Sequence, residues 1–227
     1  MNMGIKNTLV GLGLAAFALN ASATAVLTID NQNLGATDLV TIDEGAGDGN
    51  TPFIGSVDSA FYNNTGWRVD GLTGLSAADN AAAIVGDGIL DLSYNITGSG
   101  TIQLMLTDTF NDLDGFSGDL HLDGNYVLAG PGASTATVTA LVFIDGVEVA
   151  SETEVLTEAG TSYSLFDSFD YDFAFTTMSI ALLFETGDRT LTTTSGDEIL
   201  IEVPEPAPLA LLGLGLAALG FARRKAS

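Results

Sequence analysis

From Val26 onward, the sequence is a succession of short runs rich in Val, Ile, Thr, Phe and Tyr, separated by clusters of Gly, Asn and Asp. Such runs suit the pleated, half-buried surface of a β-sheet, and the clusters between them suit tight turns. The 178 residues from Val26 to Val203 are therefore predicted to form a single all-β domain, a β-sandwich of jelly-roll type. The predicted strands are Val26–Ile29, Trp67–Val69, Ile89–Ile96, Thr101–Thr107, Leu120–Leu122, Tyr126–Leu128, Thr137–Ile144, Val147–Val155, Phe173–Phe184 and Glu198–Val203.

Two Asp-Gly pairs predict the tightest turns in this domain. Asp145-Gly146 and Asp123-Gly124 each stand between two strand-like runs, and Asp-Gly is a preferred pair for a type I′ hairpin. Only Ser76–Val85 is a helix candidate, because Ser76 and Asp79 have the spacing of a capping box.

The charges along the chain are distributed unevenly. The sequence has 29 acidic and 6 basic residues, and the part from Val26 to Val203 holds 28 of the acids but only two bases, Arg68 and Arg189. This excludes nucleic acid as a partner, because phosphates must be neutralised by basic groups. The absence of cysteine excludes disulfides, iron–sulfur clusters, zinc–thiolate sites and a thiol nucleophile. A cation or a neutral molecule is the expected partner of so acidic a body.

The N-terminal segment predicts an export signal over residues 1–25. Lys6 precedes an apolar run, Leu9–Leu19, which is too short to span a bilayer but fits the hydrophobic region of a secretory signal peptide. Two overlapping Ala-x-Ala patterns follow. Cleavage is expected after Ala25, with cleavage after Ala23 as the alternative, and the Sec machinery is the implied partner.

The C-terminal segment combines three features in a fixed order. The proline-rich stretch Val203-Pro204-Glu205-Pro206 is followed by an uninterrupted apolar run, Leu209–Ala222, and then by the bases Arg223, Arg224 and Lys225. Proline removes amide donors and fixes φ, so the first stretch is an extended spacer. The apolar run predicts a transmembrane helix, and the basic end is expected to remain in the cytoplasm while the body faces outward.

This tail resembles the PEP-CTERM sorting signal of exported proteins from Gram-negative bacteria that make exopolysaccharide. Residues 203–206 stand where that family has its VPEP motif. The resemblance implies that residues 204–227 are a sorting signal, anchored transiently in the inner membrane and cleaved by an exosortase, an integral-membrane cysteine transpeptidase. The implied destination is the cell envelope, the cell surface or the extracellular matrix. A plain C-terminal anchor is the alternative; a tail of this type is also classified as the C-terminal domain of ice-binding proteins, a label that concerns the tail alone.

An aspartate-rich stretch is the candidate metal site. Acids this close together repel one another unless a cation lies among them, and calcium prefers oxygen ligands. The EF-hand spacing fails, because Gly115 in the sixth position would make Phe110 the first ligand, and solvated turn aspartates are the alternative. Calcium is nevertheless the one candidate cofactor. The candidate ligands are Asp108, Asp112, Asp114, Asp119 and Asp123.

The only tryptophan marks a candidate ligand-binding site. Trp67 and Tyr62, with Phe61 and Arg68 nearby, would offer a stacking platform for a sugar ring, although a core tryptophan is the favoured interpretation. The only histidine, His121, lies between two leucines and is expected to point outward from a strand rather than to act in catalysis.

No catalytic residue is predicted. The nucleophile motif G-x-S-x-G is absent from the sequence, and no pair of carboxylates stands out as the acid and base of a glycosidase. The favoured function is that of an exported, non-enzymatic surface or matrix protein with a structural or adhesive role in an exopolysaccharide layer. A lectin-like glycan-binding module that uses calcium is the alternative, and a hydrolase ranks third.

Overall fold

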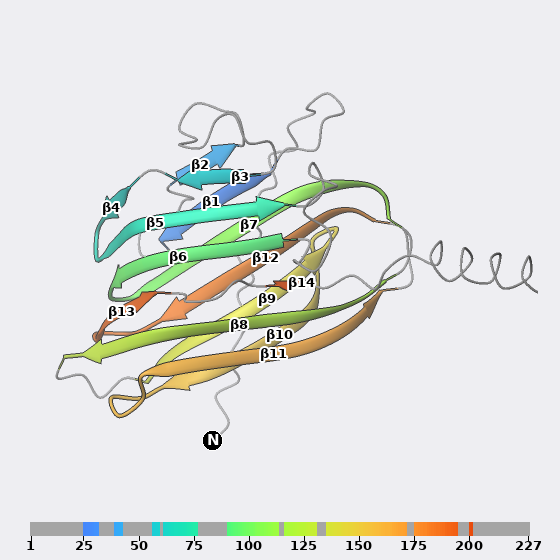
Figure 1. Ribbon diagram of the computed structural model, residues 1–227. Coiled ribbons are helices and arrows are strands. Elements are labelled where there is room, and N and C mark those ends of the chain that lie inside the picture. Colours follow the sequence, from blue (N-terminus) through green and yellow to red (C-terminus); the bar gives the residue numbers. More distant parts are fainter. Residues whose placement is uncertain are drawn as a thin grey trace, which may run out of the picture.

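The computed structural model describes residues 25–31, 39–42, 56–59, 61–76, 90–113, 116–130, 135–171, 175–194 and 200–201, and not the side chains of 111–113, 116–117 and 200–201. These residues form fourteen strands in two antiparallel sheets (Figure 1). The predicted signal peptide up to residue 24, the helix candidate beyond Ser76 and the tail from residue 202 lie outside the described residues.

The first sheet has six strands in the order β10-β9-β12-β7-β1-β2. Every neighbouring pair in it is antiparallel. Its strands are β1 (Val26–Asn31), β2 (Leu39–Ile42), β7 (Thr101–Leu113), β9 (Ala136–Ile144), β10 (Val147–Leu156) and β12 (Phe175–Glu185).

The second sheet has eight strands, with the main order β11-β8-β13-β6-β5-β3. Two short strands complete it, since β4 pairs with β5 and β14 pairs with β8. Its strands are β3 (Ser56–Ser59), β4 (Tyr62–Asn64), β5 (Trp67–Ser76), β6 (Leu90–Gly98), β8 (Phe116–Ala129), β11 (Ser162–Tyr171), β13 (Thr190–Thr194) and β14 (Leu200–Ile201).

The hydrophobic core lies between the two sheets, because alternate side chains of each strand point inward. In β9, every second residue from Ala136 to Ile144 is fully buried. Tyr94 of β6 and Phe184 of β12 meet edge to face, with ring centroids 5.5 Å apart. The predicted all-β sandwich is thus confirmed at the level of two packed antiparallel sheets. Its jelly-roll connectivity and its terminal helices remain predictions.

Each predicted strand overlaps an observed one, but in one place a single observed strand was predicted as two. Leu120–Leu122 and Tyr126–Leu128 belong to one continuous strand, β8, so the predicted turn at Asp123-Gly124 is wrong. The reason is packing, because a Cβ atom at Gly124 would collide with the Tyr163 ring of the neighbouring strand. Strands β2, β3, β4, β11 and β13 were not predicted from the sequence.

The second predicted hairpin is confirmed. Ile144 pairs with Val147 across the turn, and the two turn residues have positive φ angles, 47° at Asp145 and 78° at Gly146. Both central residues of a type I′ turn require φ > 0, which Asp tolerates and Gly adopts without strain.

Candidate functional site

The predicted calcium ligands are divided between the two sheets. Asp108 of β7 is 1% exposed, on the same side of its strand as Leu104 and Leu106, and its carboxylate accepts a 2.6 Å hydrogen bond from the Thr109 N–H. Asp119 and Asp123 lie on β8 of the other sheet and alternate with buried leucines. The side chain of Asp112 and all of Asp114 lie outside the described part of the chain.

No group of three or more His, Asp or Glu side chains among the described residues is arranged to hold a metal ion. Asp108, Asp119 and Asp123, the candidate ligands whose side chains the structure describes, therefore do not form a calcium site by themselves. The calcium site remains a prediction that depends on Asp112 and Asp114.

The predicted stacking platform is part of the core. Trp67 is 2% exposed and Tyr62 is 7% exposed, and the Trp67 ring occupies the space that a side chain at Gly98 would need. The exposed aromatic residue of this region is Phe61, with the Arg68 guanidinium 5.3 Å from its ring centroid. The core interpretation of Trp67 is thus confirmed, because alternation along β5 turns Trp67 inward and Arg68 outward.

His121 lies on the outer face of β8, as predicted. Its Nε2 is 3.1 Å from Oδ2 of Asp123, and its ring and that of Phe166 are steeply inclined, with an interplanar angle of 68° and the centroids 6.4 Å apart. Phe166 comes from β11, where it is paired with His121 and remains 60% exposed.

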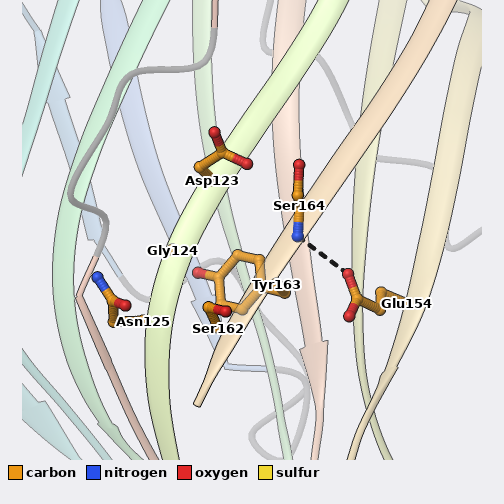
Figure 2. A pocket seen from close by; sticks show the side chains of 7 residues that line it. All are labelled: Asp123, Gly124, Asn125, Glu154, Ser162, Tyr163 and Ser164. Carbon is orange, nitrogen blue, oxygen red and sulfur yellow. Dashed lines mark hydrogen bonds between the residues drawn. The ribbon is translucent and has the colours of Figure 1, made fainter. Parts of the chain in front are cut away.

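Beside this pair, the outer face of β8 and β11 is hollowed into an open depression of about 540 Å³. Three strands contribute to it, since β10 of the other sheet reaches its rim (Figure 2). It is lined by Asp123, Gly124, Asn125, Glu154, Ser162, Tyr163 and Ser164.

Tyr163 lies beneath the depression: it is 3% exposed, and its ring lies against the bare backbone of Gly124 on the inward side of the sheet. The Tyr163 hydroxyl lies 3.1 Å from that of Thr193 and also contacts the hydroxyl of Tyr94. Thr193 in turn donates a 2.9 Å hydrogen bond to the Asn125 carbonyl. This chain of hydroxyl groups fixes the ring in one orientation.

Burial raises the pKa of the Tyr163 hydroxyl above its usual value. The hydrogen bonds with Thr193 and Tyr94 act in the opposite direction, and the negative charges of Glu154 and Asp123 add to the rise. Tyr163 is therefore a neutral phenol at physiological pH, and the negative charge of the depression comes from the two carboxylates.

The carboxylate of Glu154 has a fixed position at the rim. Its Oε2 accepts a 3.0 Å hydrogen bond from the backbone N–H of Ser164 (Figure 2). No Lys or Arg lines the depression. Its lining residues other than Gly124 and the buried Tyr163 carry two carboxylates, one amide and two serine hydroxyls, so the lining is rich in hydrogen-bond acceptors.

Except for Asp123, none of these lining residues was predicted from the sequence to belong to a site. Strand β11, which supplies three of them, carries the period-two signal in Tyr163, Leu165 and Phe169, all buried. That signal could have revealed the strand. Its pairing with β8 and its approach to β10 could not be read from the sequence.

Two of the predicted sites are the alternative cleavage positions of the signal peptide, after Ala23 and after Ala25. Ala25 is fully buried next to the start of β1. Of the two predicted cleavage positions, the one after Ala23 keeps this side chain in the exported body.

The described residues include no helix long and apolar enough to cross a membrane.

The comparisons with known proteins identify the tail. Residues 202–225 match the family model of the PEP-CTERM protein-sorting motif. The match includes the predicted motif Val203, Pro204, Glu205 and Pro206 and the basic residues Arg223, Arg224 and Lys225. The resemblance found in the sequence is thus confirmed, and a tail of this kind implies export to the cell envelope or surface and processing by an exosortase. No curated protein matches the chain.

Several solved carbohydrate-binding modules are loosely similar in structure. TmCBM61 in complex with β-1,4-galactotriose has a TM-score of 0.33 and 13% identity, over 59% of this chain and 86% of the module. A module described under "CBM4 structure and function" has a TM-score of 0.32 and 16% identity, over 60% of this chain and 88% of its own. TmCBM27, studied for mannan recognition, has a TM-score of 0.28 and 12% identity, over 65% and 88%. Similarity at this level does not transfer a ligand to this chain.

Proposed function

We propose that this chain is an exosortase-sorted protein of a Gram-negative bacterium that has a non-enzymatic, structural or adhesive role in an exopolysaccharide layer. The single observation that carries the proposal is the sorting motif at residues 202–225. In this proposal, a cleaved signal peptide starts export, the C-terminal helix anchors the protein in the inner membrane, and exosortase then separates the body from the tail. The body is a jelly-roll sandwich.

The outer faces of both sheets support a role in a hydrated polymer. Hydroxyl groups face each other across neighbouring strands: Thr139 and Thr153 at 2.8 Å, and Thr97 and Thr192 at 3.3 Å. Thr107 and Ser179 form a third pair at 2.8 Å. Such rows leave donors and acceptors at the surface, where water or sugar hydroxyls can bind them.

The sorting step is tested by replacing Pro204, Glu205 and Pro206 with alanine in the producing host. The unprocessed form is expected to accumulate in the membrane fraction, as seen by its larger mass on a gel. The same replacement in a host without exosortase is the control and should change nothing further. Normal processing of the variant would overturn the sorting proposal.

The matrix role is tested in a host unable to make exopolysaccharide. The processed protein is expected to leave the cell surface for the medium, although its cleavage proceeds as before. Full retention at the surface of such cells would contradict the matrix role and leave the sorting step intact.

The second candidate is a lectin-like glycan-binding module. The observation that favours it is the depression on β8 and β11, where acceptor groups stand beside an exposed aromatic ring. Calcium belongs to this candidate only through the predicted Asp108–Asp123 site.

A further inference from the structure

We propose that the depression between β8, β10 and β11 binds a glycan whose sugar rings carry free amino groups, with Phe166 as the stacking platform. The proposal rests on the glycan-binding candidate above and specifies its site and its ligand class.

The register of β8 and β11 brings an aromatic ring to the end of the depression. Ser164 pairs with Asp123, and Phe166 pairs with His121 two residues further along. Side chains two residues apart on a strand share a face, so Phe166 and Asp123 lie diagonally across the two strands. His121 contacts both of them, with its Nε2 3.1 Å from Oδ2 of Asp123 and its ring centroid 6.4 Å from that of Phe166. Phe166 is 60% exposed although it is fully apolar. The C–H face of a pyranose ring is a matching partner for such a surface.

The lining offers partners for the polar groups of the same ring. Glu154 uses one oxygen, Oε2, for the Ser164 N–H, and its Oε1 accepts no hydrogen bond from any residue that the structure describes. The amide of Asn125 and the hydroxyls of Ser162 and Ser164 complete the set. A ligand with several donors close together satisfies these acceptors better than an apolar molecule.

Charge decides between classes of glycan. The depression holds Asp123 and Glu154 and no base, and the whole chain has a net charge of −23. The two described arginines are engaged elsewhere, since Arg68 pairs with Asp70 and Arg189 pairs with Glu158. His121 pairs with Asp123, so Glu154 is the carboxylate of the depression that has no basic partner among the described residues. A polymer of uronic acids would be repelled, whereas an ammonium group gains a charge-assisted hydrogen bond and stacks well beside an aromatic ring.

The test measures calorimetric binding of three oligosaccharides of equal length to the exported protein, purified from its host. The probes are β-1,4-linked oligomers of glucosamine, of N-acetylglucosamine and of glucose, at a mildly acidic pH that keeps the amines protonated. The glucosamine oligomer is expected to bind about tenfold more tightly than the other two, the equivalent of one charge-assisted contact. Equal affinity for all three, or no binding, would overturn the inference.

Two variants locate the site. Glu154→Gln keeps an acceptor for the Ser164 N–H but removes the charge, and Phe166→Ala removes the platform; each is expected to weaken glucosamine binding about tenfold. The first matched control is Glu185→Gln, which removes an exposed carboxylate on the outer face of the six-stranded sheet. The second is Phe61→Ala, which removes an aromatic ring that is 56% exposed next to β4, at the opposite end of the eight-stranded sheet from β11. Both controls should bind like the parent protein.

If Glu154→Gln and Glu185→Gln weaken glucosamine binding equally, the binding is a diffuse attraction between an acidic protein and a cationic polymer. That result would overturn the proposal that the depression is the binding site. None of these outcomes affects cleavage of the tail. A failure of this inference is therefore distinguishable from a failure of the sorting or matrix proposal, which are read from processing and surface retention.

Discussion

Glu154 of β10 accepts a hydrogen bond from the backbone N–H of Ser164 on β11, at 3.0 Å, and so joins the edge strands of the two sheets. The reverse contact is also present, because Asp167 of β11 accepts a 3.1 Å hydrogen bond from the N–H of Ser151 on β10. An unpaired row of amides at a sheet edge is a template for pairing with another chain. These two carboxylates occupy amides of that kind, so they close this side of the sandwich.

Replacement of Glu154 by alanine is expected to lower the free energy of unfolding by about 1 kcal/mol, because one amide loses a charged acceptor at a partly exposed position. The Ser164 amide should also exchange its hydrogen faster. Both effects are measured on the exported protein, by denaturant unfolding and by hydrogen exchange. Glu154→Gln retains an acceptor and should restore most of the protection. Unchanged exchange at Ser164 in the alanine variant would show that the contact does not protect the edge.

Gly124 has a packing role in the middle of β8. Gly124→Ala is expected to destabilise the protein by about 1–3 kcal/mol, because the new methyl group and the Tyr163 ring compete for one space and that ring is held by hydroxyl contacts. Gly71→Ala is the matched control in the same sheet, since a Cβ atom there meets nothing within 4 Å. Denaturant unfolding of both variants checks this. Equal stabilities would mean that Tyr163 moves aside without cost.

The fold was largely predictable because its signals are local. Every second residue of β9 from Ala136 to Ile144 is apolar and buried, and Asp145-Gly146 fixes the next hairpin. Strand β11 was missed because Ser and Asp fill most of its outward positions, which by composition suggest a loop. The false turn at Gly124 has a different origin, since the need for glycine comes from Tyr163, 39 residues further along the chain.

The candidate site was less predictable than the fold, because long-range register creates it. Glu154 belongs to one sheet and Asp123 to the other, and neither position has a distinctive local sequence. The aspartate cluster was a local signal, but its members Asp108 and Asp123 lie on strands of different sheets. Proximity along the sequence is therefore a poor guide to shared ligands when a chain changes sheets between β7 and β8.

Thr186 is a buried hydroxyl at the start of the turn between β12 and β13. It is fully buried, and its Oγ1 accepts a 2.9 Å hydrogen bond from the N–H of Gly100. Thr186→Val keeps the shape but leaves that amide without its acceptor, so a loss of about 1–3 kcal/mol is expected. Thr190→Val, at an exposed position of β13, is the control and should change stability little. Denaturant unfolding distinguishes the two, and equal stabilities would contradict the role of the hydroxyl.

Asp145 makes the stability of the protein depend on pH. Partial desolvation opposes its charge, but hydrogen bonds from the backbone and hydroxyl groups of Thr176 and Thr177 outweigh this and lower the pKa of the Asp145 carboxyl. Because the pKa is lower in the folded state, this contribution is fully present above the unfolded value of about 4 and is lost as the pH falls through the folded pKa. Asp145→Asn keeps the turn conformation, since Asn also tolerates positive φ. The variant should therefore lose less stability than the parent protein when the pH falls from about 6 to about 3. The difference between the two losses is expected to be less than about 1 kcal/mol, because the Asp145 side chain is exposed. Parallel unfolding curves at both pH values check this, and an identical acid loss in the two proteins would show that Asp145 does not contribute to it.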